Sequence, residues 1–247
     1  MRTPRFYYAG DLKTGNTLEL PTELFRHAIQ VLRMKTGEAL ILFNGTGGEF
    51  LAELKTVTKR QATVAVHTFD PVNRESALQL TLVQSIIKPD KMDLAIQKSV
   101  ELGVTAIQPL LTRRSVIRLG RDQLDKKLGH WQAVAVSACE QSGRTALPDI
   151  LSPLSLDDWL EKPVSTTAIR LMLMPGDYPR LAELAASLTQ TEQISLIIGP
   201  EGGFSDNEVA LCQQNDVMVA SLGPRILRAE TAAISVTALL QQHCGDL

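Results

Sequence analysis

The spacing of apolar positions changes near residue 75, and the change predicts two kinds of structure in one chain. Before it, apolar and polar residues alternate in short runs separated by polar turns, the pattern of half-buried strands. Asn44-Gly45 is a strong hairpin signal, and a short helix is predicted from Pro21 to about Val31. Short strands with polar turns indicate a small β-barrel. The predicted strands cover residues 39–43, 48–57 and 61–69.

From Leu78 onward, continuous apolar runs alternate with stretches of helical spacing. Strands that alternate with helices indicate a parallel sheet with helices on its faces. We therefore expect an α/β domain over residues 75–247, joined through the linker 71–74 to an N-terminal domain over residues 1–74. The predicted strands are 78–87, 104–110, 169–174, 195–198 and 217–222, and the predicted helices are 88–102, 122–141 and 230–243.

Two of these strands are followed by glycine and proline and then by a helix. The first loop reads Gly-Pro-Glu-Gly-Gly-Phe-Ser from position 199, and Gly202 and Gly203 leave backbone that a ligand can approach closely. Ser205, with Glu208 three residues later, predicts a capping box. Ligands of α/β proteins bind at the carboxyl ends of strands, although an ordinary helix-initiating turn has the same composition. The spacing matches neither a phosphate loop nor a dinucleotide fingerprint, and Glu201 would repel a phosphate.

The second loop follows the strand 217–222 and reads Gly-Pro-Arg-Ile-Leu-Arg-Ala-Glu-Thr-Ala from position 223. It supplies two arginines where the first loop supplies a glutamate. A third strand end, near Met174, is followed by Pro-Gly-Asp. Because parallel strands bring their carboxyl ends to one edge of the sheet, we expect the three loops to converge on one pocket.

Composition and charge exclude several classes of protein. The 247 residues are 44% hydrophobic and 21% charged, which is ample for one large or two modest domains. A net charge of −2 argues against binding polyanions over the whole surface, but residues 1–74 carry 10 Lys/Arg against 7 Asp/Glu, which permits an RNA-binding module there. The cysteines lack disulfide or metal spacing, so we expect reduced thiols in a cytoplasmic protein. No apolar run reaches transmembrane length, and the N-terminus lacks a signal-peptide core.

Several basic and polar residues outside the loops are candidates for RNA contacts, and each has a structural alternative. Arg5 opens the segment Arg-Phe-Tyr-Tyr, which suits phosphate pairing and stacking but is more often a packed first strand. Arg113 and Arg114 follow a strand end, where they either contact phosphates or form a charged surface loop. Gln141 and Arg144 lie with Glu and Ser at the end of the long helix, where apolar packing has ended.

The segment Arg-His-Ala-Ile-Gln-Val-Leu-Arg contains two further candidates, His27 and Arg33. His27 has no partner at metal-ligand spacing, so a hydrogen-bonded structural histidine or an RNA contact is expected. On the helix 88–102, the charged residues that include Lys91 are interpreted mainly as a solvated face, with pairing between Lys98 and Glu101.

The loop sequences Gly-Pro-Glu-Gly-Gly-Phe-Ser and Leu-Gly-x-Arg-Ile-Leu-Arg-x-Glu-Thr-Ala resemble the RsmE family, the 16S ribosomal RNA (uridine N3)-methyltransferases of the SPOUT class. His-x-x-x-Val-Leu-Arg and Ala-x-Glu-Gln-Ser-x-Arg resemble the same family, and the match covers the whole chain. The resemblance implies a C-terminal SPOUT domain with a trefoil-knotted parallel sheet, an N-terminal PUA-like β-barrel that binds RNA, and a homodimer. The pattern of strands and helices alone would argue against a knot, because threaded chains are nearly absent among known folds. The resemblance further implies the cofactor S-adenosyl-L-methionine, no metal, and methylation of uridine 1498 of 16S rRNA within the small ribosomal subunit.

The pattern and the resemblance together assign residues to the two ligands. Adenine needs a flat apolar slot with backbone hydrogen bonds, and Glu201 suits either the ribose hydroxyls or the sulfonium. The expected cofactor-binding residues are Leu173, Met174, Gly199, Glu201, Gly202, Leu222, Gly223, Ile226, Leu227, Thr231 and Ala232. The expected RNA-binding residues are Arg5, His27, Arg33, Arg113, Arg114 and Gln141.

The chemistry of uridine N3 suggests the catalytic residues. N3 is a weak nucleophile until its proton leaves, and the charge then spreads onto O2 and O4, so the enzyme needs cationic or amide donors at these oxygens and a base at N3. Arg228, and Arg144 supplied by a second subunit, are the predicted donors. Glu230 is a candidate base, although a glutamate in a first helical turn also suits the helix dipole.

Two other functions fit parts of the pattern. A non-catalytic RNA-binding protein would need the glycine loops only as structural turns. A SPOUT methyltransferase that acts on ribose 2′-hydroxyl groups resembles the chain in fold, but related families place a catalytic arginine near the start of the methyltransferase domain. This sequence lacks a clear equivalent, and the loop Arg-Ile-Leu-Arg-Ala-Glu-Thr favours the uridine N3 group.

Overall fold

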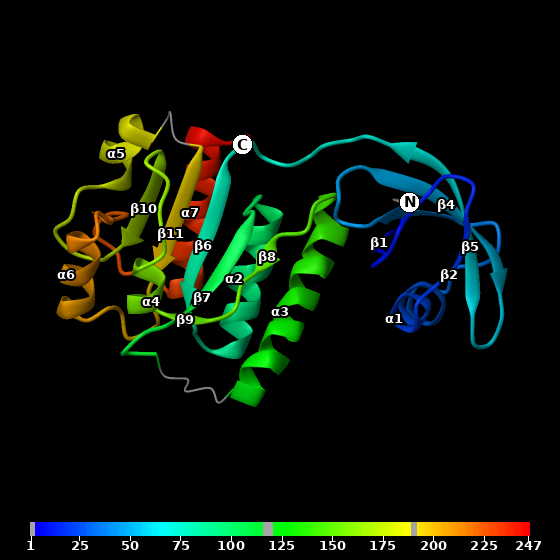
Figure 1. Cartoon of the computed structure of the whole chain (residues 1–247), viewed down its shortest axis with the longest axis horizontal. Helices are drawn as coiled ribbons and strands as arrows, with labels where there is room; N and C mark the ends of the chain where they lie inside the picture. The colour runs from blue at the N-terminus through cyan, green and yellow to red at the C-terminus, as the bar shows by residue number, and fades with distance from the viewer. Residues whose placement is uncertain (1–2, 116–120, 189–191) are drawn as a thin grey trace. The chain divides into compact units, whose positions relative to one another are not determined.

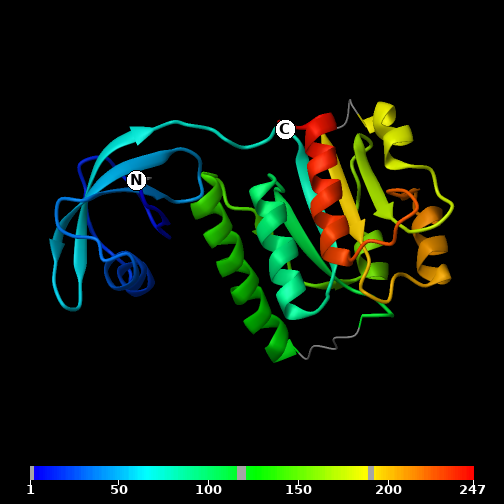
Figure 2. The same ribbon diagram turned by 180° about the vertical axis from the view of Figure 1, so that it is seen from behind.

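The chain forms two compact units in a computed structural model that describes residues 3–115, 121–188 and 192–247. The first unit combines residues 1–75 with residues 139–147, and the second combines residues 76–138 with residues 148–247. Figures 1 and 2 show the chain from opposite sides. The segment 139–147 is compact with the first unit, although it lies outside the N-terminal domain predicted from the pattern.

The first unit is built around a five-stranded sheet, as the short apolar runs predicted. Its strands lie in the order β1-β3-β4-β5-β2. β1 is parallel to β3, and the other neighbours are antiparallel. The strands are β1 (Arg5–Tyr7), β2 (Thr17–Glu19), β3 (Ala39–Phe43), β4 (Glu49–Val57) and β5 (Ala62–Asp70).

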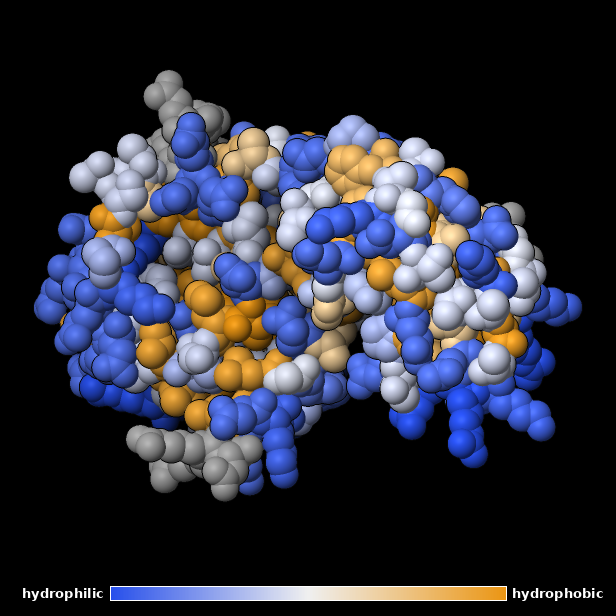
Figure 3. Space-filling model, turned by 45° about the vertical axis from the view of Figure 1, so that its right-hand side comes forward, coloured by the Kyte–Doolittle hydropathy of each residue, from blue (hydrophilic) through white to orange (hydrophobic). Residues whose placement is uncertain are grey.

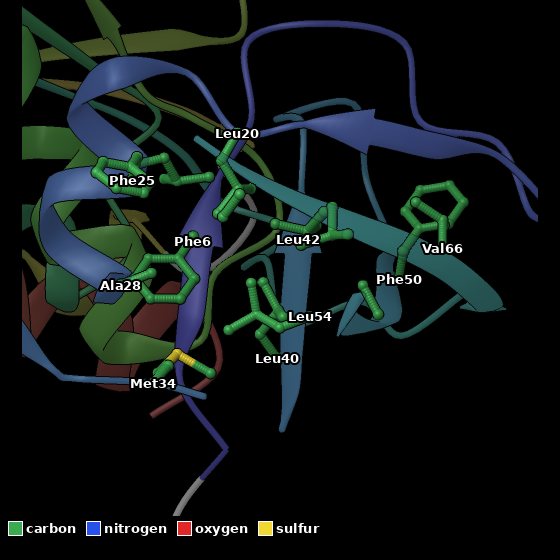
Figure 4. Packing of buried hydrophobic residues seen from close by; sticks show 14 of the residues in the cluster. Phe6, Leu20, Phe25, Ala28, Met34, Leu40, Leu42, Phe50, Leu54 and Val66 are labelled. Atoms are coloured by element: carbon green, nitrogen blue, oxygen red, sulfur yellow. The ribbon is translucent and has the colours of Figure 1, made fainter. Parts of the chain in front are cut away.

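A single hydrophobic core holds the first unit together. Alternate residues of its strands point inward, which buries Phe6, Leu42 and Leu54. Figure 4 shows Phe25 and Ala28, which come from the helical segment, beside Phe6 of β1. The aromatic segment at the N-terminus is therefore a packed first strand.

The predicted helix from Pro21 to Val31 has an unexpected geometry. One turn of α-helix, α1 (Thr22–Phe25), continues as the π-helix η1 (Arg26–Val31). A π-helix is rare and often occurs at functional sites. Arg33 follows it with a φ of 56°, in the left-handed region.

The second unit has the predicted α/β architecture, and every strand pair in its described sheet is parallel. The strand order is β12-β10-β11-β6-β7-β8, and β9 also pairs with β7. The threading of a trefoil knot stays a prediction. The strands are β6 (Gln79–Ser85), β7 (Ala106–Leu111), β8 (Asp149–Ile150), β9 (Leu154–Ser155), β10 (Ala168–Leu173), β11 (Gln193–Ile198) and β12 (Met218–Ala220). The helices are α2 (Pro89–Glu101), α3 (Arg121–Ser142), α4 (Leu156–Leu160), α5 (Leu181–Leu188), α6 (Asp206–Gln214) and α7 (Ala229–Cys244).

The register of the sheet sends alternate rows of side chains to opposite faces. Val83, Ile197 and Met172 lie side by side on neighbouring strands. They share a core with Trp159 of α4 and Val209 of α6. The preceding residue on each strand points to the other face, where α7 contacts β6 and β11 and packs beside α2 (Figure 2). Helices therefore cover both faces, and the ligand-accessible part of the sheet is its edge of strand ends.

In the described part of the chain, no helix combines the length and the apolar character that crossing a membrane requires.

Candidate active site

Segments that follow the carboxyl ends of four parallel strands line one cavity of about 650 Å³. Three are the loops after β10, β11 and β12, so the predicted convergence of these loops is confirmed. The fourth is the beginning of α2, which follows β6. A volume of this size is typical of a small-molecule site.

Most residues expected to bind a cofactor line this cavity. Thr231 is the exception, because it is exposed on the first turn of α7 and lies outside the described lining. The expected residues that line the cavity are Leu173, Met174, Gly199, Glu201, Gly202, Leu222, Gly223, Ile226, Leu227 and Ala232.

The loop after β12 contributes apolar side chains to the cavity wall. Leu222 and Leu227 contribute to it, together with Leu173 at the end of β10. Ile226 is 85% exposed, the largest value among the described large aliphatic side chains. An aliphatic side chain at a cavity mouth with this exposure offers apolar surface to a ligand or to a partner.

The glycines of the loops have different physical roles. Gly203 and Gly223 have φ angles of +66° and +112°, which side chains rarely adopt. Gly202 is different, because a Cβ atom there would lie 3.2 Å from Cβ of Arg114 and 3.3 Å from its carbonyl oxygen. Gly202 thus makes room for a neighbouring loop of the protein, whereas the sequence alone suggested only room for a ligand.

Arg113 and Arg114, predicted to contact RNA, are bound to the glycine-rich loop. Nη1 of Arg114 donates to the carbonyl oxygens of Gly202 at 3.3 Å and Phe204 at 3.1 Å. The backbone N–H of Arg113 donates to Oε1 of Glu208 at 3.0 Å. The segment after β7 therefore supports the loop that forms one wall of the cavity.

Glu208 completes the predicted capping box and joins it to the segment after β7. Its Oε2 accepts from the backbone N–H and the hydroxyl of Ser205, both at 2.8 Å. Burial raises the pKa of Glu208, but the hydrogen bonds from Arg113 and Ser205 together lower this pKa below its usual value. The carboxylate is therefore ionised at neutral pH and positions both segments.

The cavity also contains Lys88 and Lys91, beside Glu201 and Glu230, which the sequence analysis had singled out. Nζ of Lys91 lies 3.7 Å from Oε1 of Glu230, which is 6% exposed. Oε1 of Glu201 accepts from the backbone N–H of Lys88 at 3.1 Å. Lys91 lines the cavity with a side chain that is still 35% exposed, whereas Lys98 pairs with Glu101 at 2.8 Å as predicted. The sequence signal that could have placed Lys88 and Lys91 in the site is their position, because both follow the end of β6.

Arg228 and Glu230, two of the predicted catalytic residues, both line the cavity. Arg228 is the N-cap residue of α7, is exposed, and has no ion-pair partner among the described residues. Glu230 lies in the first turn of α7, as expected for a carboxylate near a helix N-terminus. The site thus contains a guanidinium without an ionic partner among the described residues, and an ion pair between a half-buried lysine and a buried glutamate.

Arg144 and Arg5 are buried in the first unit, each in an ion pair. Nη2 of Arg144 lies 2.7 Å from Oε2 of Glu75. Nη2 of Arg5 lies 2.8 Å from Oε2 of Glu49, and its Nη1 donates to the carbonyl oxygen of Cys139 at 3.0 Å. Both guanidinium groups therefore hold the interior of the first unit together, and the roles of Arg5 in RNA binding and of Arg144 in catalysis stay predictions.

The remaining predicted RNA contacts are exposed residues of the first unit. His27 and Arg33 belong to the helical segment and its end, and Gln141 lies at the end of α3. The His27 ring packs edge-on against Phe6, with 5.4 Å between the ring centroids. His27 therefore packs against Phe6, as expected for a structural histidine, and its side chain is also exposed to solvent.

Across residues 3–115, 121–188 and 192–247, no cluster of His, Cys, Asp or Glu side chains has the arrangement of a metal site. Cys139, Cys212 and Cys244 are free thiols. Burial raises the pKa of Cys139 to about 11 and that of Cys212 to about 12, so both are protonated and unreactive at neutral pH.

Fold and cavity together define an RNA methyltransferase with an accessory domain. Residues 74–241 match the RNA methyltransferase domain family, and residues 20–66 match the RNA methyltransferase PUA domain. These ranges fall in the α/β sheet with its glycine loops and in the five-stranded unit, respectively.

Full-length relatives then identify the family. The chain is 34% identical to ribosomal RNA small subunit methyltransferase E of Rickettsia conorii over 100% of both chains, and 32% identical to that of Buchnera aphidicola over 99% of this chain and 95% of the relative. Among solved structures it resembles a Legionella pneumophila protein in complex with SAM, with a TM-score of 0.95, 40% identity and full coverage of both chains. It also resembles ribosomal RNA small subunit methyltransferase E of Neisseria gonorrhoeae bound to S-adenosyl methionine, with a TM-score of 0.91, 36% identity and full coverage of both chains. The chain belongs to the ribosomal RNA small subunit methyltransferase E family, the RsmE family.

Proposed function

We propose that the chain transfers a methyl group from S-adenosyl-L-methionine to N3 of a uridine, uridine 1498, in 16S ribosomal RNA of the small ribosomal subunit. The observation that carries the proposal is the cavity at the ends of β6, β10, β11 and β12, in which Arg228 and the pair Lys91–Glu230 face the same space as the glycine loops. Two relatives with at least 36% identity over their full length were solved with this cofactor.

The residues present fit such a cofactor. Leu173, Leu222 and Leu227 supply an apolar wall for an adenine, and the positive φ of Gly203 and Gly223 turns backbone toward the cavity without a side chain in the way. The acidic residues Glu201 and Glu230 suit ribose hydroxyls and a cationic sulfonium. When bound, the cofactor supplies a methyl group on a cationic sulfur.

The chain's own residues then activate the uracil. The Arg228 guanidinium is placed to stabilise the negative charge that spreads onto O2 and O4 when N3 loses its proton. The Glu230 carboxylate is the acceptor for that proton, and Lys91 orients it through the ion pair at 3.7 Å.

The two predicted domains divide the work in this proposal. Residues 75–247 form the methyltransferase domain, and residues 1–74 bind RNA through exposed residues such as His27 and Arg33. The enzyme acts in the cytoplasm on ribosomal RNA and as a homodimer. Sedimentation of the purified protein tests the dimer.

The decisive test maps methylated nucleosides in 16S rRNA from a strain that lacks the gene. We expect N3-methyluridine to disappear from one position, to return with the wild-type gene, and to stay absent with a gene that encodes Arg228→Ala. Retention of N3-methyluridine in the deletion strain would refute the proposed reaction. Loss of a ribose 2′-O-methyl group instead would move the chain to the other SPOUT chemistry.

A further inference from the structure

The end of the helical segment in the first unit exposes two neighbouring aliphatic side chains. Val31 is 67% exposed and Leu32 is 46% exposed. Exposed apolar groups are common on this protein, as the orange areas of Figure 3 show, so exposure alone does not mark a site. The backbone that carries these two residues sets them apart.

Two unfavourable backbone features meet at this position. The π-helix η1 ends with a hydrogen bond from the Leu32 N–H to the carbonyl oxygen of His27 at 3.0 Å. Arg33 follows in the left-handed region. At the equivalent positions after α2 and α3, the chain uses Gly103 and Gly143, which adopt positive φ without strain. Arg33 therefore occupies a position where glycine would stabilise the fold, which indicates selection for its side chain.

The inner side of the same segment is firmly anchored. Phe25, Ala28 and Met34 are buried in the core of the first unit, where Figure 4 shows them around Phe6. The backbone N–H of Met34 donates to the carbonyl oxygen of Ala28 at 3.0 Å. The core thus holds the segment in its unusual geometry and presents Val31 and Leu32 at a rigid edge.

The charges around the aliphatic pair favour a polyanionic partner. From Arg26 to Arg33 the segment contains two arginines and no acidic residue. Proteins that insert aliphatic side chains against unstacked bases pair adjacent phosphates with arginine or lysine. An apolar protein partner would not need the two arginines, Arg26 and Arg33, that precede and follow the aliphatic pair in the sequence.

We propose that Val31 and Leu32, flanked by Arg26 and Arg33, form an RNA-docking wedge that packs against unstacked bases of the substrate RNA while the guanidinium groups bind the neighbouring phosphates. The inference rests on the proposed function, since that function makes RNA the substrate. It adds a contact surface to the first unit that is independent of the cavity chemistry. Its ligand is a single-stranded or distorted stretch of RNA, because only unstacked bases expose a face to aliphatic side chains.

The test measures binding of the full-length protein to 16S rRNA transcribed in vitro, at several salt concentrations. The double variant Val31→Ser with Leu32→Ser should bind roughly tenfold more weakly, the effect of exposing about one large aliphatic side chain. Its salt slope should equal that of the wild type, because no charge is lost. Arg33→Gly should lower the slope of log K against log salt by about 0.7, the value for one phosphate contact on a single strand.

Thermal unfolding separates binding from folding. Arg33→Gly should unfold at the wild-type temperature or above, since glycine adopts the φ of 56° without strain. The matched controls are Leu51→Ser, which alters another aliphatic residue of the same unit that is 45% exposed, and Arg60→Gly in the turn between β4 and β5. Both controls should bind RNA like the wild type.

Three results would overturn the wedge. The first is unchanged RNA affinity in the double variant, and the second is an Arg33→Gly variant that is less stable and keeps the wild-type salt slope. The third is a change in sedimentation without a change in RNA affinity, which would make the surface a protein interface.

Single-turnover methyl transfer at saturating RNA keeps the two proposals apart, because the double variant should react at nearly the wild-type rate. A wild-type protein that transfers no methyl group would refute the proposed function, whereas normal transfer with unchanged RNA binding in the variant would refute the wedge alone.

Discussion

The arginine residues predicted to bind RNA or to act on the uracil differ in how many partners they have within the protein. The Arg114 guanidinium donates to two backbone carbonyl groups, and the Arg5 and Arg144 guanidinium groups are held in buried ion pairs. Arg228 lines the cavity without an ion-pair partner in the part of the chain that the structure describes. A cation without an ionic partner is the group best able to bind a charge that develops only during the reaction.

Arg228→Ala should therefore lower the rate of methyl transfer by roughly a hundredfold or more while cofactor affinity stays nearly normal. Arg228→Lys keeps the charge but loses the planar fork, and it should stay slow. Raising the pH should partly rescue the alanine variant, because more of the uridine is then already deprotonated. Single-turnover transfer to small ribosomal subunits at several pH values, with calorimetric cofactor affinity in parallel, provides the measurement. A variant whose entire defect is weak cofactor binding would move Arg228 from catalysis to the cofactor pocket.

Lys91 and Lys98 allow a comparison within one helix, since each pairs with a glutamate but only Lys91 lines the cavity. Lys91→Met should reduce the transfer rate by about tenfold, because Glu230 would lose the cation that orients it. Lys98→Met should leave the rate unchanged, since a single (i, i+3) ion pair on a helix contributes little and this pair lies outside the cavity. Equal effects of the two substitutions would show that the ion pair of Lys91 has no catalytic role.

At the scale of elements, the segment after β7 and the glycine-rich loop after β11 behave as one assembly. Arg114 binds two carbonyl groups of the loop, and Glu208 joins the backbone of Arg113 to the beginning of α6. Because the loop is part of the cavity wall, its shape depends on a carboxylate outside the cavity. Glu208 therefore affects both stability and cofactor affinity.

The folded-state pKa of Glu208 lies below its usual value, so the ionised carboxylate stabilises the fold above the unfolded-state pKa, and this contribution is lost as the pH falls through the folded-state pKa. Glu208→Gln should lower the free energy of unfolding by about 1 kcal/mol at pH 7. The difference from the wild type should shrink as the pH is lowered below about 4.5. Urea unfolding at several pH values tests this. The exposed Asp206→Asn in the same helical turn is the control, and a deficit independent of pH would argue against the ionised capping box.

At the scale of the whole molecule, the two units have separate cores and separate candidate ligands. S-adenosyl-L-methionine should slow hydrogen exchange in residues 199–204, in residues 222–228 and in the first turn of α7, because these segments line the cavity. Exchange in β3, β4 and β5 should stay unchanged. Mass-spectrometric hydrogen exchange of the full chain with and without cofactor is the measurement. Equal protection of both units would contradict a cofactor site confined to the second unit.

The sequence by itself determined the features that depend on near neighbours and on periodicity. Continuous apolar runs predicted the parallel strands, because strands buried on both faces cannot alternate. The spacing of Ser205 and Glu208 predicted the beginning of α6, since a capping box forms within one turn. The order of strands and glycine loops predicted the cavity, because parallel strands end at the same edge of a sheet.

Only the tertiary structure decided which distant side chains meet. Lys91 and Glu230 are far apart in sequence, and they form a pair because α2 and α7 pack side by side. Arg114 reaches Gly202, and residues 139–147 join the first unit, through contacts that no local pattern encodes. The π-helix before Arg33 likewise depends on the core beneath it, because the local sequence predicts an ordinary helix there. The physical reason is that side-chain pairing over long sequence distances follows from packing and register, and these are properties of the folded chain as a whole.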